Sequence, residues 1–310
     1  MGFSPLDPRG AVRALARAAD PGPDVPAGSV DELIDVDGTD PGLFGPGSAA
    51  WRLHGDAATV IGGFRSLLLQ ALHPSVMAGV AQHSSFRDDP FGRLERTSRF
   101  VVATVYGTTA DAEQAVATVR RVHRKVRGTR SDGEVYDAAD PHLVTFVHAT
   151  EVDSFLAANR AYGRRRLSPT DADRYCDEMA AIAHRLGATD VPRTAAGTAR
   201  WLAERGDELH LGRDGRATLR FLFNPPVSLL SRPAHAAVAT AAVGLLPLWA
   251  QVRLRLPAVP PADALVVRPG VNALLATFHW AFPPRPEALA TRRAAAVAAG
   301  VQGRPSARST

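Results

Sequence analysis

A histidine followed four residues later by an arginine is the clearest candidate for cofactor chemistry in this sequence. His123 comes four residues after Val119, at the edge of an apolar stripe in a segment that predicts a helix over 111–127. On such a helix Arg127 projects beside His123. An imidazole on an apolar helix face can ligate a metal ion or a haem iron, or it can be a core histidine satisfied by a hydrogen bond. The spacing alone leaves both interpretations open.

The preceding segment, predicted to be helical over 93–106, places cations on a face that should point inward. Five side chains share this face at helical spacing: Arg93, Arg96, Thr97, Phe100 and Thr104. A buried arginine needs an anionic partner, because an unpaired charge is costly to bury. Such a partner can be Asp88, Asp89 or the propionate of a cofactor. The alternative is a helix end whose arginines reach solvent.

A third helix, predicted to begin at Asp140-Pro141 and to run to about Asn159, carries His148 and Glu151. Glu151 falls near the middle of the apolar stripe of this helix. Burial there would raise the pKa of its carboxyl group and make it a candidate acid or base. Pairing with a neighbouring arginine is the alternative reading of this residue.

Composition excludes several classes of site. The 310 residues are 45% hydrophobic and 22% charged, with a formal net charge of +5, which indicates a globular protein rather than a disordered or fibrous one. Cys176 is the only cysteine, so internal disulfides, Cys₂ or Cys₄ zinc sites and iron–sulfur clusters are excluded. No nucleotide-binding glycine motif is present, since Gly62-Gly63 falls inside an apolar helical stretch. The arginine clusters at 164–166 and 292–293 lack interleaved aromatic residues, so no nucleic-acid partner is expected.

The elements that must position these side chains are predicted to be helices throughout. Residues 1–50 are rich in Gly, Pro and Asp and predict an irregular arm with one short helix near 9–19. Further helices are predicted over 57–72, 74–83, 169–186, 194–211, 234–256 and 286–299, with a short helix or strand at 217–223. No alternating run is long enough for a sheet. The prediction is an all-α, single-domain helical bundle over 51–290 with a tail at 291–310.

No segment predicts export or membrane insertion. The amino terminus has no continuous apolar core of the kind that a secretory signal needs. The apolar stretch 236–250 is interrupted by Pro247 and is shorter than the roughly 20 residues of a transmembrane helix. We therefore expect a cytoplasmic protein. The apolar residues 234–256 can be core, a subunit contact or an element at a membrane surface, and the oligomeric state is left open.

Four blocks occur in an order that resembles a known family. They read GGFRSLLLQALHP, HSSFRDDPFGRLERTSRFVVATVYG, VRRVHRKVRG and YDAADPHLVTFVHATEVDSF, and the segments YCDEM and LGATDVPRT follow. Over about residues 50–290 the chain is similar to the MpaB and latex-clearing-protein (rubber oxygenase) family, which is especially common in actinobacteria. The resemblance implies an all-helical fold that binds one haem b.

The resemblance also implies roles for individual residues. His123 matches the proximal haem ligand, and its H-x-x-x-R context extends to Arg127. A distal motif of arginine, two residues, a basic residue and threonine matches Arg93, Arg96 and Thr97. Rubber-cleaving members carry a lysine that can cap the iron where this chain has Arg96. A guanidinium is a poor iron ligand, so the resemblance implies a five-coordinate or water-bound iron here.

Together these arguments predict a haem b-dependent oxygenase that uses O₂ on a hydrophobic small molecule. Oxidative cleavage of a carbon–carbon double bond in an isoprenoid-like chain is the chemistry that the family implies. Arg93, Arg96, Thr97 and Glu151 are the catalytic candidates, while Arg127, Phe100 and His148 join His123 as cofactor-binding candidates. One alternative is a non-catalytic helical protein that binds haem or lipid. Another is a non-haem iron enzyme that uses histidines such as His73, His123 and His148.

Overall fold

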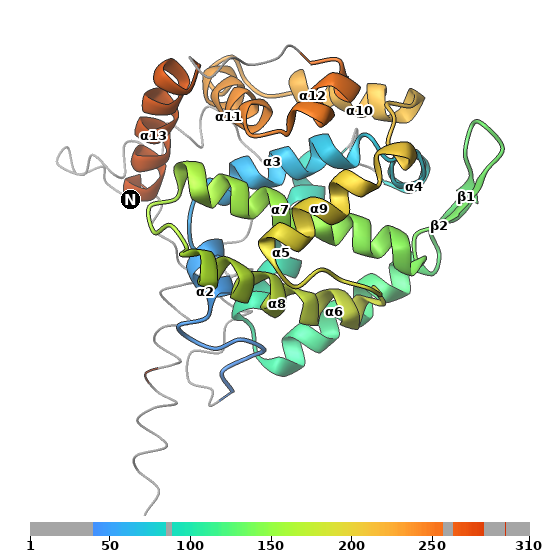
Figure 1. Ribbon diagram of the computed structural model, residues 1–310, viewed down its shortest axis with the longest axis horizontal. Helices are drawn as coiled ribbons and strands as arrows, with labels where there is room; N and C mark the ends of the chain where they lie inside the picture. Colours follow the sequence, from blue (N-terminus) through green and yellow to red (C-terminus); the bar gives the residue numbers. More distant parts are fainter. Residues whose placement is uncertain (1–39, 85–88, 257–262, 282–294, 296–310) are drawn as a thin grey trace, which may run out of the picture.

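The computed structural model describes residues 40–84, 89–256, 263–281 and Ala295, and it is almost entirely helical in these parts (Figure 1). The helices are α2 (Ala49–His54), α3 (Ala58–Gln70), α4 (Pro74–His83), α5 (Pro90–Tyr106), α6 (Thr109–His123), α7 (Pro141–Tyr162), α8 (Pro169–Leu186), α9 (Ala195–Glu204), α10 (Arg213–Phe223), α11 (Arg232–Gly244), α12 (Leu248–Leu254) and α13 (Asp263–Ala281). A short 3₁₀ helix, η2, covers Gly206–Glu208. The predicted all-α fold is confirmed.

The helices α3 and α7 form the centre of the molecule and pack closely along each other (Figure 1). Helix α11 lies against α3 on one side, and α8 lies against α7 on the other, with α6 packed on α8. Gly62 allows the close approach of α3 to α7, because a Cβ atom at this position would lie 2.7 Å from Cδ1 of Phe155 and 3.1 Å from the carbonyl oxygen of Ser154. The predicted helical setting of Gly62 and Gly63 is confirmed.

A buried arginine ties these central helices together. The guanidinium of Arg65 on α3 pairs with Asp153 of α7 at 2.7 Å. It also donates hydrogen bonds to Oγ of Ser154 at 2.7 Å and to the carbonyl oxygen of Leu245 at 2.9 Å. Because its side chain is only 4% exposed, this ion pair is shielded from water and fixes α7 against α3 and the end of α11.

Two hydrophobic clusters flank the central pair of helices. The larger is built around α3, α7 and the carboxyl-terminal helices, with Leu68 and Phe146 among its buried members. The second joins α2, α5, α7 and α8, and contains Trp51, Tyr175 and Cys176. The single thiol of Cys176 is fully buried, and burial raises its pKa to about 11.

Proline and capping signals place several helix starts where the sequence predicts them. Helices α4, α7 and α8 each carry proline in the first turn, which a helix start tolerates. The side chain of Asp140 caps α7 by accepting from the amide of His142, and Ser168 caps α8 in the same way from Asp171. Gly187 ends α8 in the left-handed conformation at φ 104°.

Other predicted boundaries differ from the structure. The helix predicted over 194–211 ends at Glu204 and gives way to η2, and 217–223 belongs to the helix α10. Helix α13 was not predicted; it holds Pro269 in its interior, a residue that normally signals a helix end. The predicted helix near 9–19 lies outside the described residues, as does nearly all of the one over 286–299.

The predicted helix over 111–127 is wrong at its carboxyl end. Helix α6 stops at His123, and the chain then enters strand β1 (Arg127–Thr129), which pairs antiparallel with β2 (Val135–Asp137). Gly128, the next residue after the predicted helix, pairs with Tyr136 across the ladder. A Cβ atom there would lie 2.7 Å from the Tyr136 hydroxyl. The chain therefore leaves the helix at His123 and forms a hairpin that projects from the helical body (Figure 1).

Candidate functional site

Helices α5 and α6 and the hairpin that follows carry most of the predicted haem residues. The two helices pack against each other and are joined by Gly107 and Thr108. Thr108 caps α6 reciprocally with Asp111. The end of α4 links the two regions, because Arg93 of α5 donates to Ser84, while the neighbouring His83 lies 3.1 Å from the carbonyl oxygen of Arg127, four residues after His123.

His123 is half-buried, and its ring carries a polar atom without a partner. Nδ1 is shielded from solvent and has no hydrogen-bond partner among the described residues. Burial lowers the pKa of the imidazole, and the nearby carboxylate of Asp137 opposes that shift in part. The neutral form is therefore favoured near pH 7, and the neutral imidazole is the form that ligates iron or another transition metal. The alternative interpretation, a histidine satisfied by a hydrogen bond, is not supported at Nδ1.

Arg93 is a desolvated cation in the first turn of α5. Its guanidinium donates to Oγ of Ser84 at the end of α4, and among the described residues it has no carboxylate partner. Burial lowers the pKa of Arg93, and the neighbouring charge of Arg96 lowers it further. A guanidinium held in this way suits an anionic ligand that supplies the missing charge.

The remaining residues of the predicted α5 face are not equally buried. Arg96 is exposed and pairs with Asp89 at 3.3 Å, as the sequence allowed. Thr97 is exposed and donates to the carbonyl oxygen of Arg93 at 3.0 Å. Phe100 is half-buried and Thr104 is buried. The face therefore runs from solvent at its amino-terminal end into the core.

Apolar side chains flank His123 at the surface. Val122 on α6 is 52% exposed, and Leu94 on α5 is 64% exposed. Val122 directly precedes His123 on α6, and Leu94 directly follows Arg93 on α5. Exposed apolar area beside an unpartnered imidazole is what a flat hydrophobic cofactor or substrate would cover.

Arg127 lies on strand β1 and not on a helix with His123, so its predicted projection beside His123 at helical spacing is wrong. Its Nε pairs with Asp137 at 2.8 Å across the hairpin. Its carbonyl oxygen is 3.1 Å from Nε2 of His83 at the end of α4. The hairpin nevertheless keeps Arg127 in the neighbourhood of His123, because Asp137 interacts with both residues.

The two candidates on α7 lie against α8. His148 is buried, its Nε2 has no hydrogen-bond partner among the described residues, and burial lowers its pKa to about 4, with a smaller contribution from His184. Burial raises the pKa of Glu151 to about 7. The carboxyl of Glu151 in turn contributes to the raised pKa of Tyr175 on α8. Neither His148 nor Glu151 hydrogen-bonds to His123 or Arg93 within the described residues.

The histidine set of the non-haem iron alternative does not come together. Among the described residues, the group with metal-ligand spacing consists of His73, His142 and Glu208, without His123 or His148. His142 and Glu208 were not predicted. They are 66 residues apart in the chain, and no local pattern marks such a pair.

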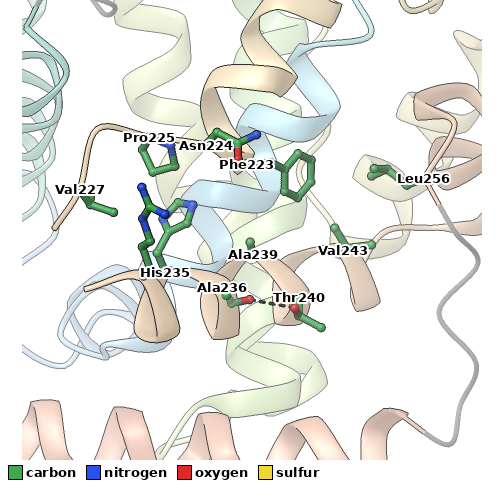
Figure 2. A pocket seen from close by; sticks show the side chains of 11 residues that line it. Phe223, Asn224, Pro225, Val227, His235, Ala236, Ala239, Thr240, Val243 and Leu256 are labelled. Atoms are coloured by element: carbon green, nitrogen blue, oxygen red, sulfur yellow. Dashed lines mark hydrogen bonds between the residues drawn. The ribbon is translucent and has the colours of Figure 1, made fainter. Parts of the chain in front are cut away.

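A separate groove of about 450 Å³ lies between α10 and α11 (Figure 2). It is lined mostly by apolar side chains, among them Phe223 and Val243, together with His235 and Arg232. Helices α3 and α7 lie between α11 and the α8–α6 side of the molecule. The groove contains none of the predicted site residues, but it shows that part of 234–256 lines an open surface rather than core alone.

None of the described helices combines the length and the apolar character that crossing a membrane requires.

Comparison with known proteins identifies the family. A family model described as "ER-bound oxygenase mpaB/B'/Rubber oxygenase, catalytic domain" matches residues 51–280. No curated protein and no solved structure matches the chain. Since the match covers more than half of the chain, the protein belongs to this oxygenase family, and the predicted resemblance is confirmed.

Proposed function

We propose that this member of the oxygenase family is a haem b-dependent oxygenase that acts on a hydrophobic small molecule, with His123 as the axial ligand. The observation that carries the proposal is the unpartnered, buried Nδ1 of His123 at the end of α6. A polar atom buried without a partner is costly, and ligation of the ring would hold the side chain in place and orient it.

The cations Arg93 and Arg127 suit the two propionate carboxylates of a haem. Arg93 is a desolvated cation without a described carboxylate, so it is the residue best suited to a propionate. Arg127 is a second cation in the same neighbourhood, with its charge already shared with Asp137. We assign the stronger role to Arg93 for this reason.

The accessible residues on α5 define the oxygen-binding side in this proposal. Arg96 and Thr97 lie on the exposed turn after Arg93, and the half-buried Phe100 follows on the same face. A guanidinium offers hydrogen-bond donors and no acceptor, so Arg96 would orient polar ligands without capping a metal. When bound, haem supplies an iron centre able to activate O₂ for oxidation of a carbon–carbon double bond, the reaction that we propose for an isoprenoid-like substrate.

Glu151 can hold or release a proton near neutral pH. Its pKa of about 7 places the carboxyl close to half-protonation under physiological conditions. We propose that Glu151 donates or accepts a proton. We assign His148 to packing beside the cofactor, since burial keeps its imidazole neutral.

The test is the absorbance spectrum of the full-length protein, purified and then reconstituted with hemin. We expect a Soret band in the wild type and its loss or shift in His123→Ala. His184→Ala, which alters an exposed histidine on α8, is the control and should load haem normally. Protein that stays colourless after reconstitution, or equal haem loading by wild type and His123→Ala, would overturn the proposal.

A further inference from the structure

Three segments that are far apart in the sequence meet at His73, His142 and Glu208. His73 precedes α4, His142 lies in the first turn of α7, and Glu208 ends η2. One nitrogen or carboxylate oxygen of each residue lies within 4.8 Å of those of the other two. This cluster, which we call the His73 cluster, shares no residue with the site at His123.

His73 is the member that ordinary packing does not explain. Its side chain contacts the ring of Phe146, with ring centroids 4.8 Å apart, and the residue is 6% exposed. Both ring nitrogens are buried, and neither has a hydrogen-bond partner among the described residues. A neutral imidazole always carries one donor and one acceptor, so burying both without partners costs free energy that a bound ligand would offset.

The other two members face solvent and already touch each other. Nε2 of His142 lies 2.6 Å from Oε2 of Glu208, and the two side chains are 40% and 43% exposed. This hydrogen bond accounts for His142 and Glu208 but leaves His73 unsatisfied. Their exposure also provides the path by which an ion could enter from water.

The backbone holds Glu208 close to His73. The amide of His210 donates to the carbonyl oxygen of Leu72 at 2.8 Å, which joins the segment after η2 to the segment before α4. Leu209, between Glu208 and His210, is buried in the larger hydrophobic cluster. The approach of these segments is therefore fixed by packing and does not depend on the side chains of the cluster.

We propose that the His73 cluster binds a divalent transition-metal ion, for which Zn²⁺ is the probe, with one coordination position left to water. Two imidazoles and one carboxylate form a known type of three-ligand zinc set with an open fourth position. Tetrahedral bonds of 2.0–2.1 Å place ligand atoms about 3.3 Å apart. Rotation of the exposed His142 and Glu208 side chains brings the cluster to that spacing.

The charges around the cluster are compatible with a cation. Burial lowers the pKa of His73 to about 4, so its imidazole is neutral and available as a ligand. Arg130 and His210 lie nearby, and the charge of Arg130 is balanced by its ion pair with Asp132. A bound ion would join α4, α7 and η2, in addition to the packing, the His210–Leu72 backbone hydrogen bond and the His142–Glu208 contact.

Isothermal titration of chelator-treated, full-length protein with ZnCl₂ tests the proposal. We expect one Zn²⁺ per chain, with affinity reduced at least tenfold in His142→Ala and in Glu208→Gln. Both changes affect exposed side chains, so the fold should be retained. Asp207→Asn is the matched control, because Asp207 is an exposed carboxylate on the same 3₁₀ turn outside the cluster.

The possible results separate this proposal from the proposed function. His123→Ala should keep the Zn²⁺ affinity of the wild type even where it loses haem, because the cluster does not contain His123. Equal Zn²⁺ affinity in wild type, His142→Ala and Glu208→Gln would overturn the cluster as the binding site. Absence of Zn²⁺ binding at micromolar concentrations in the wild type would overturn the proposal altogether.

Discussion

Two adjacent glycines in α3 should respond in opposite ways to the same substitution. Gly62 and Gly63 both occupy the interior of the helix, where Ala is favoured over Gly by about 1 kcal/mol. A Cβ atom at Gly63 would meet nothing within 4 Å. At Gly62 it would lie 2.7 Å from Cδ1 and 3.0 Å from Cα of Phe155, and 3.1 Å from the carbonyl oxygen of Ser154. The ring of Phe155 can turn, but the two backbone atoms cannot move without separating α7 from α3.

The magnitudes follow from these distances. Gly63→Ala should increase the free energy of unfolding by about 1 kcal/mol, since it gains helix propensity without a clash. Gly62→Ala gains the same propensity but forces apart two packed helices, which costs about 1–3 kcal/mol. The difference between the two variants should therefore be about 1–3 kcal/mol, with Gly63→Ala the more stable.

Urea denaturation followed by far-UV circular dichroism measures this difference. The comparison is valid where the dependence of the free energy on urea is the same in both variants. Equal stabilisation by Gly62→Ala and Gly63→Ala would show that α3 and α7 do not approach as closely as described.

Further changes test the buried charges. Arg65→Met leaves Asp153, Ser154 and the carbonyl oxygen of Leu245 without their donor, so we expect a loss of about 3 kcal/mol in the free energy of unfolding by urea. A loss below about 1 kcal/mol would contradict a buried ion pair. Burial raises the pKa of Glu151 from 4.5 to about 7. Between these two pH values the folded protein binds more protons at Glu151 than the unfolded chain does. The contribution of Glu151 to the free energy of unfolding therefore falls as the pH rises. Glu151→Gln should therefore be more stable relative to the wild type at pH 8 than at pH 4, and the same relative stability at both pH values would argue against a buried carboxyl.

Features decided by neighbouring residues could be predicted from the sequence. The starts of α4, α7 and α8 follow from a first-turn proline, and those of α7 and α8 also from side-chain caps within three residues. The break between α5 and α6 follows from Gly107 and the Thr108 cap. Such signals depend on local hydrogen bonds and so do not require knowledge of the fold.

Features decided by distant residues could not be predicted. Helix α6 ends at His123 because the chain pairs with Val135–Asp137, and a sequence pattern over 111–127 does not contain that partner. The same holds for the His73 cluster, whose members come from three separate segments. Helix α13 was not predicted because Pro269 is a local signal for a helix end, and packing against α11 overrides that signal.

The buried thiol of Cys176 allows local opening of the protein to be measured by thiol labelling. The thiol of Cys176 is buried in the second hydrophobic cluster, with Thr198 of α9 at 4.0 Å, and its pKa is raised to about 11, so a thiol reagent reacts with it only in molecules where this cluster has opened. Because the chain has no second cysteine, the labelling rate reports that single event, and loading with cofactor or metal can be followed by how far it slows the reaction.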